Sequence, residues 1–324
     1  MPAALGYTSP AADHSELWPD SMPRLAVRHL TVYHYRRPVR FGEHRLTFRP
    51  RDSHDLRLID TALTISPRAK VRWLHDVFSN STAIASFEEA AAELRIESRI
   101  EVEHYGLDNP DVAVEDYASS YPFQYASDDA PDLVRTIERH YPDPDRQIDN
   151  WAKAFLNGHA TVQTQDLLDR INSAIHQQFA YETRFAIGTQ SPTETLARGR
   201  GTCRDLALFM MEVARAFGLA ARFVSGYLYD PALDPANNHA DRQSLPDRDV
   251  TQGGGHTHAW VQIYLPGAGW VEYDPTNGIV GGRNLIRVAV ARDPAQALPL
   301  HGTFFGAADD FLDMQVGISV TRHD

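Results

Sequence analysis

The chain has 324 residues, 43% hydrophobic and 23% charged, so it can bury a sizeable core and is not disordered throughout. Its formal net charge of −12 argues against a nucleic-acid binder, which needs an electropositive surface. The single cysteine, Cys203, excludes an intrachain disulfide and a metal site built from cysteines alone.

Hydropathy and the first residues indicate where the protein works. No run of 18 apolar residues occurs, so we predict neither a membrane span nor a membrane partner. Residues 1–21 lack the positively charged start and the apolar stretch of a secretory signal, and we interpret them as a flexible polar tail. We therefore expect a cytoplasmic protein, in which a free thiol stays reduced.

Residues 22–105 are predicted to form an N-terminal β-sandwich domain. The segment 25–35 is rich in β-branched and aromatic residues, and the segment 94–103 places apolar side chains at alternate positions. Short strands at this spacing are typical of a sandwich. Residues 106–160 are interrupted by several prolines, which predicts a connector with short helices.

Residues 161–324 are predicted to form a single catalytic domain. Apolar residues at helical spacing predict one helix over 164–179 and another that runs from Cys203 to a C-cap at Gly218. Strands are predicted at 221–229, 258–265, 269–273, 285–290 and 311–320, the second and third forming a hairpin. The loop 230–255 is long and rich in Asp, Pro, Asn and Gly, and our hypothesis is that it acts as a lid.

The position of Cys203 is chemically informative. It follows a glycine-rich turn and lies in the first turn of a strongly amphipathic helix. Free backbone N–H groups and the positive end of the helix dipole favour a thiolate there, and the same N–H groups can hold an oxyanion. The alternative interpretation is a small buried hydrophobic side chain.

A nucleophilic cysteine needs a base, and the base needs a group that orients it. His258 and His256 are two residues apart and would lie on the same face of a strand, so spacing alone does not choose between them. His258 belongs to the predicted strand and is therefore the better base. On the returning strand, Asp274 is the best-placed acid to orient the imidazole, with Glu272 as the alternative. The order of Cys203 on a helix, His258 on a strand and Asp274 on the next strand indicates a catalytic site more strongly than any one of these residues does alone.

Several blocks of this half of the chain resemble the bacterial transglutaminase-like proteins, a family that includes proposed cysteine proteases. They are Gly201-Thr202-Cys203-Arg204-Asp205, Ala220-Ala221-Arg222-Phe223-Val224-Ser225-Gly226-Tyr227, His258-Ala259-Trp260-Val261, Pro266-Gly267-Ala268-Gly269-Trp270 and Asp274-Pro275-Thr276-Asn277. The resemblance covers about residues 160–300, and residues 25–102 resemble the N-terminal β domain of the bacterial members more loosely. The chain departs from the family at Thr257, where Met is usual, and at Ala291, where Gly is usual. These departures affect substrate fit or local packing more than chemistry.

The resemblance implies an α+β fold, with a papain-like transglutaminase core behind an N-terminal β-sandwich. It also implies Cys203 as nucleophile, His258 as base and Asp274 as the orienting acid. We expect no cofactor, and no metal because the sequence contains no metal-binding motif such as His-Glu-x-x-His or an EF-hand loop. The expected reaction is acyl transfer at a peptide or protein amide through a thioester acyl-enzyme. We favour water as the acceptor, which gives a peptidase or amidase. Amine transfer, which cross-links proteins, and a non-catalytic binding or scaffold protein stay open, as does the oligomeric state.

Four further residues beside these blocks receive weaker assignments. Trp260 and Tyr181 are candidates for binding the substrate or the oxyanion, against the alternative that both belong to the core. Arg204 and Asp205 follow the cysteine on its helix, and we expect them to form a helix cap or an ion pair rather than to take part in the chemistry.

Overall fold

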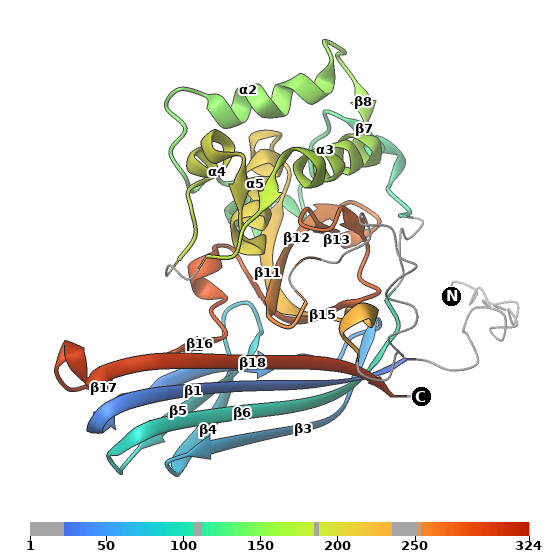
Figure 1. Ribbon diagram of the computed structural model, residues 1–324. Helices are drawn as coiled ribbons and strands as arrows, with labels where there is room; N and C mark the ends of the chain where they lie inside the picture. Colours follow the sequence, from blue (N-terminus) through green and yellow to red (C-terminus); the bar gives the residue numbers. More distant parts are fainter. Residues whose placement is uncertain (1–22, 107–111, 185–187, 235–251, 253, 324) are drawn as a thin grey trace, which may run out of the picture.

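The computed structural model describes residues 23–106, 112–184, 188–234, 252 and 254–323 (Figure 1). The predicted tail at 1–21 lies outside these described residues. So does most of the loop 230–255, and with it the hypothesis that this loop is a lid.

The N-terminal part is a sandwich of two antiparallel sheets (Figure 1). The first sheet contains β1 (Arg24–Phe41), β3 (Leu56–Ser66), β6 (Ala91–His104), β17 (Phe304–Phe305) and β18 (Phe311–His323). The second contains β2 (His44–Arg49), β4 (Ala69–His75), β5 (Ser81–Phe87) and β16 (Leu300–His301). Apolar side chains from facing strands, among them Phe41, Leu46, Ala85 and Ile96, form a buried cluster, which confirms the predicted sandwich.

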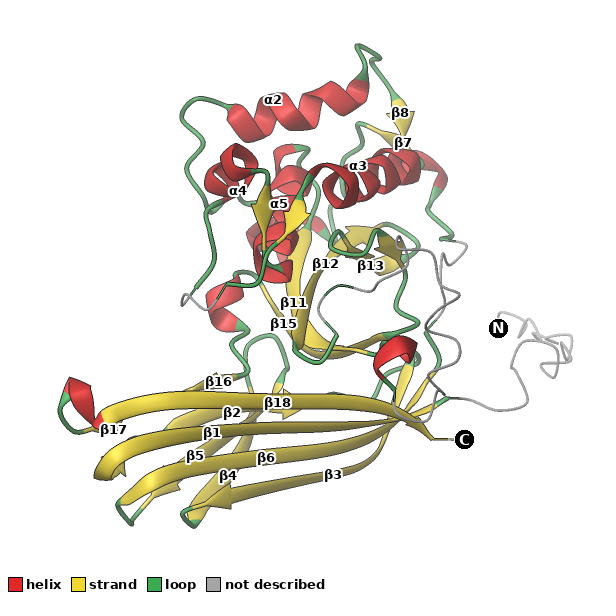
Figure 2. Ribbon diagram, in the orientation of Figure 1, coloured by secondary structure: helices red, strands yellow, loops and turns green. Residues whose placement is uncertain are grey.

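The last strand of the chain corrects the predicted domain division. We predicted that residues 161–324 form one domain, but β18 pairs with β1 over almost its whole length, with Val320 opposite Val27. Figure 2 shows the C-terminal strand lying along the sandwich. The 18-residue β1 pairs with β6 on one edge and needs a partner on the other. A period-two pattern predicts a strand, but not the sheet that the strand joins.

The connector and the core supply the remaining elements. The connector contains η2 (Asp116–Ala118), β7 (Ser120–Tyr121), α1 (Ala130–Ile137), α2 (Gln147–Lys153), η3 (Ala154–Leu156) and β8 (Val162–Gln163). The core contains α3 (Thr164–Gln178), β9 (Ala180–Tyr181), α4 (Pro192–Arg198), β10 (Arg200–Gly201), α5 (Cys203–Ala216), β11 (Ala221–Leu228), η4 (Pro231–Leu233), β12 (Thr257–Leu265), β13 (Gly269–Asp274), β14 (Ile279–Val280), β15 (Leu285–Ala291) and η6 (Pro294–Gln296), whereas η7 (Ala308–Asp310) joins β17 to β18 in the sandwich. Among the helices of the described residues, none combines the length and the apolar character that a membrane span requires.

The central sheet of the core has the order β14-β13-β12-β11-β15 and is antiparallel throughout. Its helices cover one face and the sandwich lies on the other side (Figure 2). Alternate residues of β12, such as Val261 and Ile263, pack with α3 and α5 in the main hydrophobic cluster. The intervening residues Trp260 and Gln262 belong to the opposite face because side chains alternate along a strand.

The sandwich and the core share a buried interface. Leu25 and Val102 of the sandwich cluster with Tyr227 and Ile286 of the core. The Asn80 side chain bonds the backbone of Val290 twice, donating to its carbonyl at 2.7 Å and accepting from its N–H at 2.9 Å. These contacts fix the two parts relative to each other, since an apolar cluster and paired hydrogen bonds must break together if they separate.

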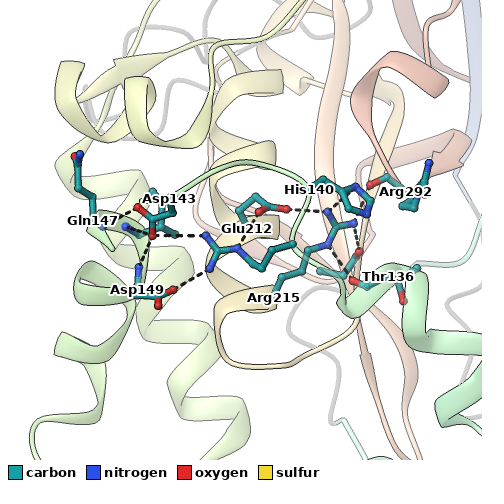
Figure 3. Close-up of polar contacts among 11 residues, drawn as sticks. Thr136, His140, Asp143, Gln147, Asp149, Glu212, Arg215 and Arg292 are labelled. Atoms are coloured by element: carbon teal, nitrogen blue, oxygen red, sulfur yellow. Dashed lines mark hydrogen bonds and ion pairs between the residues drawn. The ribbon is translucent and has the colours of Figure 1, made fainter. Parts of the chain in front are cut away.

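A buried ionic network ties the connector to α5 (Figure 3). The Glu212 carboxylate accepts from Arg139 Nε at 2.9 Å and from Arg215 Nη1 at 2.8 Å, and its side chain is fully buried. Arg215 also donates to the carbonyl of Thr136 in α1 and to the carbonyl of Arg292. The network therefore holds the helix that begins at Cys203 against the connector and the end of β15.

Replacing Glu212 with glutamine should destabilise the protein by about 3–5 kcal/mol, because two arginines would lose their shared carboxylate inside the protein. Urea unfolding monitored by circular dichroism would measure this change. The matched control is Glu194→Gln, which breaks an exposed pair with Arg198 and should cost less than about 1 kcal/mol. Equal unfolding midpoints for the two variants would contradict the role given to Glu212.

Candidate active site

Cys203 is the first residue of α5, as predicted. Thr202 is the N-cap residue, and its side chain accepts from the N–H of Asp205 while the Asp205 carboxylate accepts from the N–H of Thr202. This capping box satisfies two backbone donors at the helix start. Gly201 is required here because a Cβ at this position would lie 2.7 Å from the Asp205 Cβ. The Cys203 side chain is 6% exposed, within the main core cluster.

The charge of Asp205 is neutralised locally. Its fully buried carboxylate accepts from Arg184 at 2.9 Å and from the N–H of Gln190 at 2.7 Å. The expectation that Asp205 forms a cap or an ion pair is confirmed, because it forms both. A negative charge in the first turn would otherwise oppose a thiolate at Cys203, so Arg184 is a supporting residue that the sequence did not reveal.

His258 and Asp274 meet inside the protein. His258 Nε2 lies 2.7 Å from Asp274 Oδ2, and both side chains are fully buried. The other ring nitrogen, Nδ1, is buried and makes no conventional hydrogen bond within the described part of the chain. The Cys203 thiol lies near enough to this imidazole to contribute to raising its pKa. The structure therefore brings together the three residues that the sequence singled out.

Electrostatics favour the protonated imidazole. Burial alone would lower the pKa of His258, but the charge and hydrogen bond of Asp274, followed by those of Cys203, raise it well above the ordinary value of 6.5. Burial would raise the pKa of Asp274, but the neighbouring His258 charge and hydrogen bonds lower it. Both shifts favour the charged forms of the pair, an imidazolium beside a carboxylate.

Asp274 is itself held in place by the turn that follows it. Its carboxylate accepts from the backbone N–H of Thr276 at 3.0 Å and from Asn277 Nδ2 at 2.7 Å. Asn277 was named above only within a block that resembles the family, but it supplies a side-chain donor to the orienting acid. The signal in the sequence that could have pointed to Asn277 was an Asx turn beginning at the functional aspartate.

The alternative base and acid are placed elsewhere. His256 is exposed and precedes β12. Glu272 accepts from Gln262 and Arg287 rather than from the imidazole. The geometry thus favours His258 over His256 as the base and Asp274 over Glu272 as the orienting acid.

Tyr181 lies beside the start of α5, the helix that begins at Cys203. In the short parallel pair of β9 and β10, Tyr181 is opposite Gly201, two residues before Cys203. Burial and the nearby Cys203 charge raise the pKa of Tyr181, and the side chain is only partly buried. Tyr181 is therefore near the thiol and accessible.

The structure corrects the substrate-binding role predicted for Trp260. Its side chain is 0% exposed and stacks on the His258 ring, with centroids 5.9 Å apart. It also packs with Val224 and Leu285 in a separate buried cluster. Trp260 has no surface for a substrate and instead supports the imidazole from within the sheet. The sequence pattern around Trp260 does not indicate how deeply this side chain is buried.

The arrangement has the parts of a thiol acyl-transfer site: a thiol at a helix N-terminus, a buried imidazolium and an oriented carboxylate. Within the described ranges, no three His, Cys, Asp or Glu side chains gather as metal ligands.

Comparison with known proteins gives two family matches. Residues 149–275 match the transglutaminase-like superfamily, and residues 25–103 match the bacterial transglutaminase-like N-terminal region. The first match contains Cys203, His258 and Asp274, and the second spans most of the sandwich.

Curated relatives agree with these matches. An uncharacterised protein of Mycobacterium leprae is 34% identical over 129 residues, which are 40% of this chain but only 41% of that protein. An uncharacterised protein of Mycobacterium tuberculosis is 27% identical over 306 residues, covering 91% of this chain and 92% of the relative. A protein-glutamine gamma-glutamyltransferase of Pseudomonas aeruginosa is 35% identical over 112 residues, which are 34% of this chain and 15% of that enzyme.

A solved structure shares the whole fold. It belongs to a Cytophaga hutchinsonii protein described as a candidate cysteine protease, and it has a TM-score of 0.63 and 16% identity. The match covers 93% of this chain and 91% of that chain. At this identity the likeness shows the two-part fold alone.

Proposed function

We propose that this chain, which matches the transglutaminase-like superfamily over residues 149–275 and the bacterial transglutaminase-like N-terminal region over residues 25–103, is a cysteine amidohydrolase, a peptidase or amidase. The observation that carries the proposal is the buried His258–Asp274 pair, whose imidazole is under the electrostatic influence of the Cys203 thiol. Burying a charged pair is costly, and a pKa perturbed by burial together with a specific partner is typical of a functional site.

The proposed reaction begins with the Cys203 thiolate and the His258 imidazolium. The sulfur attacks the amide carbonyl and forms a tetrahedral oxyanion. His258 then donates its proton to the departing amine, and the C–N bond breaks to leave a thioester. Water attacks the thioester while His258 takes its proton, which releases a carboxylic acid and restores the thiolate. Asp274 keeps the ring oriented and stabilises its charge throughout.

We propose two groups that stabilise the oxyanion. The backbone N–H of Cys203 belongs to the first turn of α5, where N–H groups have no partner within the helix. The Tyr181 hydroxyl is the second candidate, because Tyr181 pairs with Gly201 and responds to the Cys203 charge. We propose that Tyr181 donates to the oxyanion, a step that a phenol with a raised pKa can take while it stays protonated.

The acyl acceptor decides between two enzymatic functions. Water needs no second binding site, which favours hydrolysis. Amine transfer is the second candidate, because one relative of the core is a protein-glutamine gamma-glutamyltransferase. The same three residues serve both reactions, so the difference is in the fate of the thioester.

A competition experiment should separate these outcomes. The protein is incubated with peptides from a bacterial proteome digest and with a fluorescent primary amine, and the products are identified by mass spectrometry. We expect new carboxylates, from cleavage or deamidation, to outnumber amine adducts, and we expect both to vanish in Cys203→Ala. A majority of amine adducts would establish transfer instead. No Cys203-dependent product would support the non-catalytic alternative and overturn the proposal.

A further inference from the structure

A cavity lies between the sandwich and the core sheet, on the face of the sheet opposite the helices. Its volume is about 850 Å³, which is within the range typical of small-molecule sites. The β2–β3 loop, with Arg51 and Asp55, forms one wall, and strands β11, β12, β13 and β15 form the floor. Cys203, His258 and Asp274 are absent from its lining.

Arg222 on the floor of this cavity carries a charge without a countercharge. Its Nε donates to the neutral amide oxygen of Gln262 at 2.7 Å, and its guanidinium lies 4.0 Å from the centroid of the Trp270 ring. Within the described ranges, no carboxylate forms an ion pair with it. Burial, followed by the repulsion of Arg287 and Arg51 against the partial attraction of Glu272, lowers the pKa of Arg222 to about 9.

The charges that line the cavity balance in number, with three arginines (Arg51, Arg222 and Arg287) and three carboxylates (Asp52, Asp55 and Glu272). Arg287 binds Glu272 and Asp55 together, with a distance of 3.1 Å from its Nη2 to Asp55 Oδ1. Glu272 also accepts from Gln262 Nε2 at 2.9 Å, and Asp52 accepts from a backbone N–H in the sandwich. Arg222 differs from Arg287 because its guanidinium bonds only a neutral amide, which leaves N–H donors that an anion can use.

Shape and charge together indicate which anion fits. A guanidinium presents a planar fork of N–H donors that matches a carboxylate bidentately. A single guanidinium without an ion pair suits one negative charge better than the greater charge of a phosphate. Phe78, Val288 and Val290 line the rest of the cavity and offer an apolar surface. We propose that this cavity binds a small carboxylate with an apolar body, which Arg222 anchors through its guanidinium.

Binding of 4-fluorobenzoate, followed by fluorine NMR, tests the proposal. The full-length protein is first alkylated at Cys203, so that binding at the thiol site cannot contribute and failure of the proposed amidohydrolase does not affect the outcome. We expect saturable binding that is at least tenfold weaker for the neutral 4-fluorobenzamide. Arg222→Gln should weaken it at least tenfold, whereas Arg72→Gln, at an exposed position of β4, should leave it unchanged.

A second variant keeps the test decisive if Arg222→Gln unfolds. Gln262→Glu supplies a carboxylate to Arg222 from within the protein and should also weaken binding of 4-fluorobenzoate. Equal binding of the acid and the amide, or no saturation up to 10 mM acid, would overturn the proposal. Displacement by inorganic phosphate at lower concentrations than by benzoate would overturn the choice of a carboxylate.

Discussion

Cys203→Ala should lower kcat/KM for amide cleavage by at least about a thousandfold, because no other group can form the thioester. The protein should stay folded, since the change removes one sulfur atom from a side chain that is 6% exposed. The cost in stability should be about 1 kcal/mol or less. Product formation from a peptide identified in the competition experiment, together with the thermal unfolding midpoint, would measure both effects.

Two results would contradict this expectation. Activity retained in Cys203→Ala would show that the thiol is not the nucleophile. Activity lost together with the fold would show only a structural role. Cys203→Ser is the closer variant in size, and it should be nearly as inactive because a hydroxyl is a far weaker nucleophile than a thiolate.

Asp274→Asn should lower kcat/KM by about a hundredfold to ten-thousandfold while preserving the shape of the site. The Asp274 charge raises the pKa of His258, so the amide variant should bring that pKa down. At neutral pH less of the imidazole would then be protonated, and the departing amine would lose its acid. Because the remaining activity depends on the protonated ring, its pH optimum should move to lower pH. A profile of kcat/KM between pH 4 and pH 9 would measure the shift.

The matched control for this variant is Asp132→Asn. Asp132 is an exposed acid on α1, so its replacement should change neither the rate nor the profile. An Asp274→Asn enzyme with the profile of the natural protein would show that the buried contact with His258 is structural. Asp274→Glu provides a further check. It restores the negative charge on a displaced carboxylate, so its pH optimum should lie between those of Asp274→Asn and the natural protein.

The three residues of the site could be predicted from the sequence because local patterns determine their places. A capping signal and an amphipathic stripe place Cys203 at a helix start. A tight hairpin, in which Val261 pairs with Tyr273, brings the ends of β12 and β13 together and with them His258 and Asp274. The choice of His258 over His256 rested on strand membership, and it agrees with the geometry.

The parts that could not be predicted depend on contacts distant in the sequence. Arg184 reaches Asp205 across 21 positions from a loop with no pattern of its own. The pairing of β18 with β1 joins opposite ends of the chain, and no period in either strand specifies the other. The complete burial of Trp260 follows from the cluster that Val224 and Leu285 build around it. Each of these outcomes is decided by tertiary packing rather than by local propensity.

Alkylation of Cys203 by iodoacetamide as a function of pH tests most directly whether the thiol and His258 form an ion pair, and it needs no substrate. We expect a rate that stays high at acid pH, far below the range near pH 8.5 where a free thiol titrates. His258→Ala should remove this acid-side reactivity. A rate that follows the titration of free cysteine, or an acid-side rate that survives in His258→Ala, would contradict the proposed catalytic thiolate.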